Sequence, residues 1–124
     1  MIYYIKGEII ELTPTETVVE CYVIGYNILI SVQTYSALEG KNNAIVYIHH
    51  YIREDEELYY GFATKEERKM FRLLIGVSGV EATTALIMLG FTKANVTKAV
   101  NAVLKEDPTA TVETIIRKSL QRLS

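Results

Sequence analysis

The sequence predicts a small β-barrel in the first half of the chain and a helical second half. Five short runs rich in β-branched and aromatic residues occur at 2–12, 17–24, 26–32, 44–52 and 58–62, with turn residues between them. Five such strands in about 62 residues are typical of a closed barrel. After residue 63, apolar residues recur at helical spacing instead. The 124 residues suffice for one or two small domains.

Turn and break signals divide the first half into these strands. Gly7 lies inside the first run, where glycine often marks a bend or a bulge. The T-P-T-E sequence at 13–16 predicts a turn, and Gly25 predicts the break between the second and third strands. Residues 35–38 are long enough for one helical turn, and residues 39–43 form a polar loop before the fourth strand. The last two strands flank four consecutive acids, so these acids should lie at an exposed hairpin tip.

Residues 64–75 have the pattern of an amphipathic helix. Thr64 and Glu67 have the spacing of a capping box at its start. The predicted apolar stripe consists of Met70, Phe71, Leu74 and Ile75. The other face carries the cations Lys65, Arg68, Lys69 and Arg72.

Charge is distributed unevenly along a chain whose net charge is −2. Residues 1–64 carry three bases and nine acids, and residues 65–124 carry ten bases and six acids. This contrast indicates two modules with different electrostatic roles. We expect a cytoplasmic protein, because no apolar run approaches the roughly 20 residues of a membrane span, no signal peptide is recognisable, and a single cysteine suits a reducing compartment.

Several chemical functions are disfavoured by the residues present. His49 and His50 are neighbours in a strand and should face opposite sides, so they cannot chelate one metal. Cys21 has no nearby base to activate it, and no phosphate-binding G-x-x-x-x-G-K-[ST] motif occurs, so we predict no catalytic residue, metal or cofactor. The aromatics of the first half could stack single-stranded bases. However, the barrel has only three bases among nine acids, which favours tyrosines that simply fill strand positions.

The stretch R-E-D-E-E-L-Y-Y-G-F at 53–62, followed by K-E-E-R and an apolar helix, resembles the RuvA family. Members of that family are the Holliday-junction-binding subunits of the bacterial branch-migration complex. The resemblance implies that the barrel is an OB-fold and that Glu54 and Asp55 are the acidic pin at the centre of a DNA junction. One departure is Tyr22-Val23, at positions where the family usually has small residues.

The middle of the chain resembles the family only in part. RuvA chains normally continue with two helix-hairpin-helix motifs, of which Ser78-Gly79-Val80 matches the start of the first. The resemblance makes Ser78, Gly79 and Val80, with Lys65 and Arg68 on the preceding helix, the expected DNA contacts. Glu81 stands where the next glycine is expected, and the second hairpin is absent. Either the chain carries a deletion, or the sequence joins ordered segments of a longer protein.

The remaining residues are similar to the C-terminal module of the family, a three-helix, ubiquitin-associated-like bundle that engages the motor subunit RuvB. Gly90 should end its first helix, Asp107-Pro108 its second, and Thr111 with Thr114 should open its third. The expected division is therefore a barrel at 1–63, a helix and hairpin remnant at 64–80, and the motor-binding module at 81–124. By resemblance, the motor contacts are Leu86, Leu89, Phe91 and Leu120.

The implied function is that of a non-catalytic subunit of the branch-migration helicase, acting in recombination, DNA repair and the SOS response to DNA damage. The implied partners are four-way junction DNA, the RuvB ATPase, the RuvC resolvase and further copies of the chain, as a tetramer or octamer. The alternative is a protein–protein adaptor that has lost DNA binding along with the hairpins.

Overall fold

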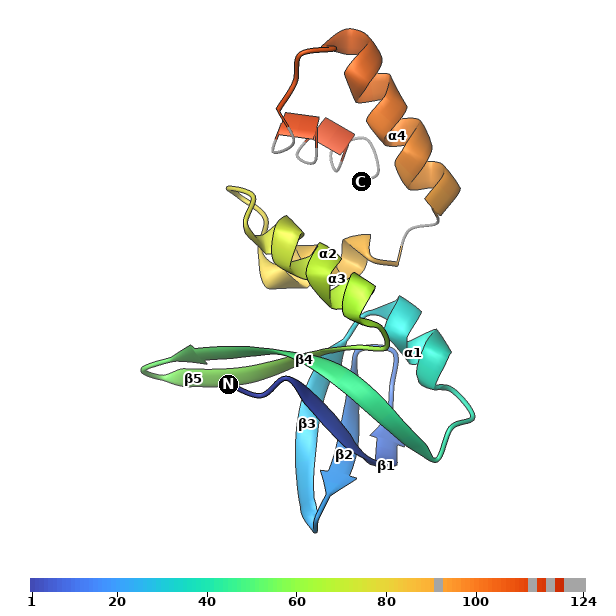
Figure 1. The fold of residues 1–124 in the computed structure, drawn as a ribbon, viewed down its shortest axis with the longest axis vertical. Helices are drawn as coiled ribbons and strands as arrows, with labels where there is room; N and C mark the ends of the chain where they lie inside the picture. The colour runs from blue at the N-terminus through green and yellow to red at the C-terminus, as the bar shows by residue number, and fades with distance from the viewer. Residues whose placement is uncertain (91–92, 112–113, 116–117, 120–124) are drawn as a thin grey trace.

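The computed structural model describes residues 1–90, 93–111, 114–115 and 118–119, and for residues 93–97 it describes the backbone alone. A five-stranded barrel forms one end of the molecule, and the helices that follow it lie on one side (Figure 1). The strands are β1 (Tyr4–Leu12), β2 (Glu16–Cys21), β3 (Ile24–Ile30), β4 (Asn43–Arg53) and β5 (Glu56–Phe62). The helices are α1 (Val32–Leu38), α2 (Lys65–Ile75), α3 (Ala82–Met88) and α4 (Lys93–Glu106).

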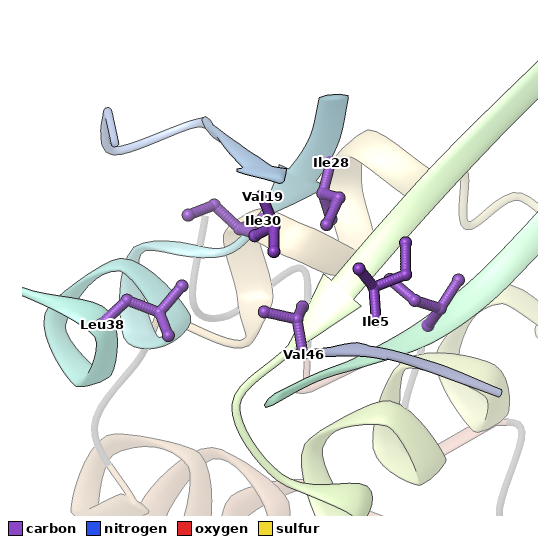
Figure 2. Close-up of a cluster of buried hydrophobic side chains, with 7 residues drawn as sticks. Ile5, Val19, Ile28, Ile30, Leu38 and Val46 are labelled. Carbon is purple, nitrogen blue, oxygen red and sulfur yellow. The ribbon is translucent and has the colours of Figure 1, made fainter. Parts of the chain in front are cut away.

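The sheet closes in the order β1-β2-β3-β5-β4, which confirms the predicted barrel. All neighbours are antiparallel except β3 and β5, which pair in parallel at Leu29 with Tyr60 and Ile30 with Gly61. The interior is filled by aliphatic side chains from four strands and α1, most of which are labelled in Figure 2: Ile5, Val19, Ile28, Ile30, Leu38, Val46 and Ile48. Burial of this cluster is the main stabilising contribution to the barrel.

Two glycines allow the barrel to close tightly. A Cβ at Gly7 would lie 2.0 Å from the carbonyl oxygen of Glu20, so glycine is needed where β1 approaches β2. The register shift in β1 lies between Ile9 and Glu11, two residues beyond the predicted position. A Cβ at Gly61 would lie 2.4 Å from Ile28 inside the barrel, so this position too has no room for a side chain.

The turn between β2 and β3 differs from the prediction. Cys21 pairs with Ile24, so Tyr22 and Val23 form a two-residue turn, and Gly25 lies inside β3 rather than at a break. Both turn residues have positive φ, 50° and 69°, the conformation that two-residue hairpins require and that glycine and asparagine usually supply. Tyr22 and Val23 have high β-propensity, which is why the sequence suggested an unbroken strand. Their side chains are 94% and 91% exposed.

The structure confirms part of what the sequence predicted for α2 and α1. The Thr64 hydroxyl accepts from the backbone N–H of Glu67, as expected at the start of α2. The Glu67 carboxylate faces inward instead of completing the capping box. The predicted apolar stripe is correct for Phe71 and Leu74, which are buried, but Met70 is 49% exposed. The single helical turn predicted at 35–38 is longer in the structure. Helix α1 begins at Val32, which was expected to end a strand.

The C-terminal part is helical, as predicted. Helix α3 ends before Gly90, and α4 ends before Asp107. Thr111 accepts from the backbone N–H of Thr114 at 3.2 Å, and residues 114–115 are helical, so the third helix begins where the threonine pair indicated. In the part of the chain that the structure describes, every helix is too short or too polar to cross a membrane.

Replacing Val23 with glycine tests the strain in the β2–β3 turn. The left-handed conformation costs a residue with a side chain roughly 1–2 kcal/mol, and the greater freedom of an unfolded glycine offsets part of that gain. We therefore expect Val23→Gly to raise the free energy of unfolding by about 1 kcal/mol, or a few degrees in Tm. Val23→Ala, which keeps a Cβ, should stabilise less. A lower Tm for Val23→Gly than for the parent would contradict this account of the turn.

Candidate functional site

The β4–β5 hairpin extends away from the rest of the barrel (Figure 1). Arg53 pairs with Glu56 at its end, so Glu54 and Asp55 form a two-residue tip. Both acids are exposed, and neither makes a side-chain hydrogen bond or ion pair with any described residue. The sequence thus correctly predicted an exposed tip for Glu54 and Asp55, whereas Glu56 and Glu57, expected beside them in the loop, belong to β5. The role of Glu54 and Asp55 as a pin stays a prediction.

The stem of this hairpin is braced on one face by a polar network. Glu57 accepts hydrogen bonds from His50 Nε2 at 2.7 Å and from the Tyr59 hydroxyl at 2.9 Å. The His50 ring stacks on Tyr59 with centroids 4.6 Å apart. The hydrogen bonds from His50 and then Tyr59 hold the pKa of Glu57 below its usual value. These contacts join β4 to β5 near the tip and limit how far the tip can move.

The other face of the hairpin forms one wall of a groove of about 800 Å³. Tyr51, Leu58 and Tyr60 line this wall, Phe71 and Ile75 of α2 form the floor, and residues 80–83 form the opposite wall. Near the tip, the Arg53 guanidinium lies 5.1 Å from the centroid of the Tyr51 ring. The groove combines apolar and polar lining, with charges of both signs from Arg53, Glu56 and Glu81.

Helix α2 is fixed beside the barrel by a buried carboxylate. Glu67 is 8% exposed and accepts hydrogen bonds from the Ser31 hydroxyl at 2.5 Å and the Thr34 hydroxyl at 3.0 Å. Ser31 also caps α1, and Thr34 also accepts from the Ala63 backbone N–H. Burial raises the pKa of Glu67, and the hydroxyl donors only partly oppose that effect. This network joins α1, the end of β5 and the start of α2.

Arg68, expected to contact DNA, lies buried on the barrel side of α2. Its Nη1 donates to the backbone oxygens of Tyr3 at 2.8 Å and Ile48 at 3.3 Å. Its guanidinium also stacks 4.1 Å from the centroid of the Tyr3 ring. These contacts tie α2 to β4 and to the residues before β1, which favours a structural role. Lys65, the other expected contact on α2, is exposed.

A turn after α2 holds the remaining expected DNA contacts. Ser78 and Gly79 are exposed, and Gly79 has φ of 84°. The backbone N–H of Val80 donates to the Val77 oxygen at 3.1 Å and is therefore already used. Glu81 caps α3 without a side-chain hydrogen bond to its backbone. The Glu81 carboxylate therefore directly follows residues 78–80, whose N–H groups would bind a phosphate according to the resemblance.

The expected motor contacts lie partly on α3. Leu89 is 9% exposed and lies in a second core cluster with Phe62, Phe71 and Ala85, and Leu86 packs against this cluster. Helix α3 therefore packs on α2, in a cluster that includes Phe62 of β5, across the domain boundary expected at residue 80. Phe91 and Leu120 lie outside the described residues. The domain boundaries and the motor contacts stay predictions.

The two histidines face opposite sides, as expected. His49 Nδ1 accepts from Arg72 Nε at 3.2 Å, and burial, followed by the charges of Arg72 and Arg68, lowers the pKa of His49. His50 faces Glu57 instead. Within the described ranges, no three metal-ligating side chains come together. The sequence did not predict that Glu67 faces inward or that His50 contacts Glu57. A two-residue tip at Glu54 and Asp55 fixes the strand register, and that register would have placed His50 near Glu57.

Comparison with known proteins agrees with this arrangement. A model of the RuvA N-terminal domain matches residues 1–61, and a model of the RuvA C-terminal domain matches residues 80–124. A relative from Porphyromonas gingivalis is 43% identical over 123 residues, which cover 99% of this chain and 61% of that protein. A relative from Parabacteroides distasonis is 35% identical over 196 aligned positions, which cover 99% of this chain and all of that protein. Both are named Holliday junction branch migration complex subunit RuvA.

Fold and site together define an OB-fold protein with an exposed acidic hairpin and an appended helical module. The chain belongs to the RuvA family. It spans about three-fifths of the length of the Porphyromonas gingivalis relative. The alignment with the Parabacteroides distasonis relative has 196 positions, and this chain has 124 residues. At least 72 positions of that relative therefore have no counterpart in this chain. Only residues 62–79 lie between the two matched segments, which agrees with the absence of most of the family's middle block from this chain.

The buried Glu67 should make stability depend on pH. Its pKa is raised in the folded chain above the ordinary value of 4.5, so the unfolded chain loses this proton first as pH rises. The contribution of Glu67 to stability is therefore fully present below about pH 4.5 and is lost as pH rises towards its folded pKa. We expect the difference in Tm between the parent and Glu67→Gln to change over this range, with the parent gaining relative stability towards low pH. A difference independent of pH would show that Glu67 keeps its ordinary pKa.

Proposed function

We propose that this chain is a non-catalytic subunit of the Holliday junction branch-migration complex, which binds four-way DNA junctions and recruits the RuvB ATPase in recombination and repair. The observation that carries this proposal is the pair Glu54 and Asp55, exposed and unpaired at the tip of a braced hairpin in a RuvA-family barrel. The names of the relatives support the junction and the motor as partners.

The acidic tip acts by repulsion. Two like charges 4 Å apart repel by about 1 kcal/mol in water and by more where water is excluded. Carboxylates held at the crossover of a junction would push phosphates apart and keep the strands separate while the motor draws the arms through. A rigid stem is needed for this, and the His50–Glu57–Tyr59 network provides one.

Further partners follow from the same proposal. Four copies around one junction would bring four acidic tips together at the crossover, which fits a tetramer, with an octamer formed by two tetramers on opposite faces of the junction. The RuvC resolvase would act on the same junction. A subunit of a DNA-processing complex of this kind works in the cytoplasm, and the residues of the chain itself bind the DNA and the motor without a cofactor.

A second candidate function is a protein–protein adaptor without junction binding. It is favoured by Glu81, whose carboxylate stands beside the turn that should contact a phosphate, and by the absent middle block. Retention on four-way-junction DNA at increasing salt separates the two functions, because phosphate contacts give a steep fall in affinity with salt. We expect weaker junction binding than for the Porphyromonas gingivalis relative. Nanomolar binding by the 14.0 kDa chain would show that its main DNA contacts are not at residues 78–80.

Neutralising the tip tests its role at the junction. The double variant Glu54→Gln with Asp55→Asn removes the repulsion but keeps the size of both side chains. We expect its affinity for four-way junctions to be equal to or higher than that of the parent, with a smaller preference for junction over linear duplex. Affinities for both DNAs, measured side by side, check this. A clear loss of junction affinity in the neutral variant would contradict the proposed role of the tip.

Phe91 and Leu120 test the motor contact. If they bind the motor, Phe91→Ala and Leu120→Ala should each weaken capture of RuvB by about 1 kcal/mol or more while changing Tm little. Leu74→Ala is the control for core truncation, because Leu74 is 5% exposed in a core cluster and is not an expected motor contact; its truncation should cost roughly 2–5 kcal/mol of stability. Melting curves and pull-down with RuvB are compared for all three. If both test variants unfold, or both bind RuvB normally, the assignment is wrong.

A further inference from the structure

The turn between β2 and β3 presents three consecutive apolar residues to solvent. Tyr22 is 94% exposed, Val23 91% and Ile24 56%. Figure 1 shows this turn at the end of the molecule opposite α4. Single apolar residues are normal on a protein surface, but several together at one projecting turn are typical of an interaction site.

The backbone of this turn is strained. Tyr22 and Val23 have φ of 50° and 69°, a conformation that glycine or asparagine would adopt at little cost. For a β-branched residue such as Val23 it is a genuine outlier. Strain of this kind concentrates at sites that bind another molecule. The exposed side chains of the turn, rather than its backbone, therefore point to its role.

A hollow of about 390 Å³ lies directly beside the turn. Tyr22 forms part of its wall, and Lys6 of β1 contributes a positive charge to it. The rest of the lining is aromatic, aliphatic or sulfur-containing: Ile2, Tyr4, Ile5, Cys21 and Tyr26. An apolar protrusion and a mostly apolar hollow thus adjoin on one surface of the barrel.

The charges around the hollow lack partners within the chain. Glu20, just before the turn, lies opposite Glu8 across β2 and β1, and Lys6 lies two residues before Glu8. None of the three forms an ion pair with any residue that the structure describes. Two carboxylates directly opposite each other repel, so a cation brought from outside would stabilise them. A second copy can supply this cation, because its own Lys6 lies at the edge of its hollow.

We propose that two copies of the chain associate through this surface, with Tyr22 and Val23 of each copy inserted into the hollow of the other. A two-fold rotation places each protrusion over the other hollow, so a surface that carries both is complementary to itself. The same rotation brings Lys6 of one copy towards Glu8 and Glu20 of the other. The contact uses neither the acidic tip nor the turn at residues 78–80, so it goes beyond junction binding.

The pairing is weak and depends on concentration. A buried aromatic side chain removes roughly 150–250 Å² from water. Tyr22 from both copies thus supplies about a third of the roughly 1,200 Å² at which standard interfaces begin. The valines and the walls of the two hollows add to this area, which places the contact near the lower limit of specific interfaces.

Sedimentation equilibrium of the full chain between about 10 µM and about 1 mM, a range that covers weak interfaces, tests the pairing. The mass of the parent should rise about twofold, whether the unit that pairs is one chain or a larger assembly. The double variant Tyr22→Gly with Val23→Gly should keep the lower mass. Both glycines relieve the strained turn, so its Tm should not fall, and lost pairing cannot then be ascribed to unfolding.

Ile87→Ser is the matched control, because Ile87 is an apolar residue of α3, 64% exposed and remote from the turn. It should pair like the parent. Lys6→Glu should weaken pairing at least about tenfold, since like charges repel across an interface, and adding Glu20→Lys should restore it.

Cys21, the single cysteine, reports whether the contact lies in the hollow. Its reaction with excess N-ethylmaleimide should slow as the concentration of the parent rises, because a partner fills the hollow. For the double glycine variant the rate should not depend on concentration. Equal masses for the parent and this variant, or labelling that does not slow where the mass doubles, would overturn the proposal. Binding of phosphatidylcholine vesicles without pairing would overturn it too, by assigning the turn to a lipid surface.

Discussion

The attachment of α2 to the barrel is the constraint on which the rest of the structure depends. Glu67 and Arg68 are adjacent residues of opposite charge, both buried, yet they do not pair with each other. Glu67 is satisfied by two hydroxyls near α1, and Arg68 by two backbone oxygens and a tyrosine ring. Because a buried polar group without partners is costly, each of them specifies one position and one rotation of the helix. That rotation sets the α2 side of the groove and directs Lys65 towards Tyr3.

The sequence predicted those parts of the structure whose signals are local. The existence of the β4–β5 hairpin, the Thr64 cap and the acidic tip all depend on residues a few positions apart. The errors have a different physical origin. Arg68 was assigned to a solvent-facing stripe because charge normally faces water, and only the long-range contacts with Tyr3 and Ile48 reverse that preference. The turn at Tyr22 and Val23 was missed because turn propensity argues against those residues there.

Helix α3 contributes Ala85, and its C-cap residue Leu89, to the same apolar cluster as Phe62 of β5 and Phe71 of α2. Six residues separate α2 from α3, so the two helices cannot move far apart while the chain is folded. Loosening of α3 would expose Phe62 and Phe71 to water and weaken the attachment of α2. The barrel and the first helix of the C-terminal segment thus form one cooperative unit, in which opening of one part lowers the stability of the other.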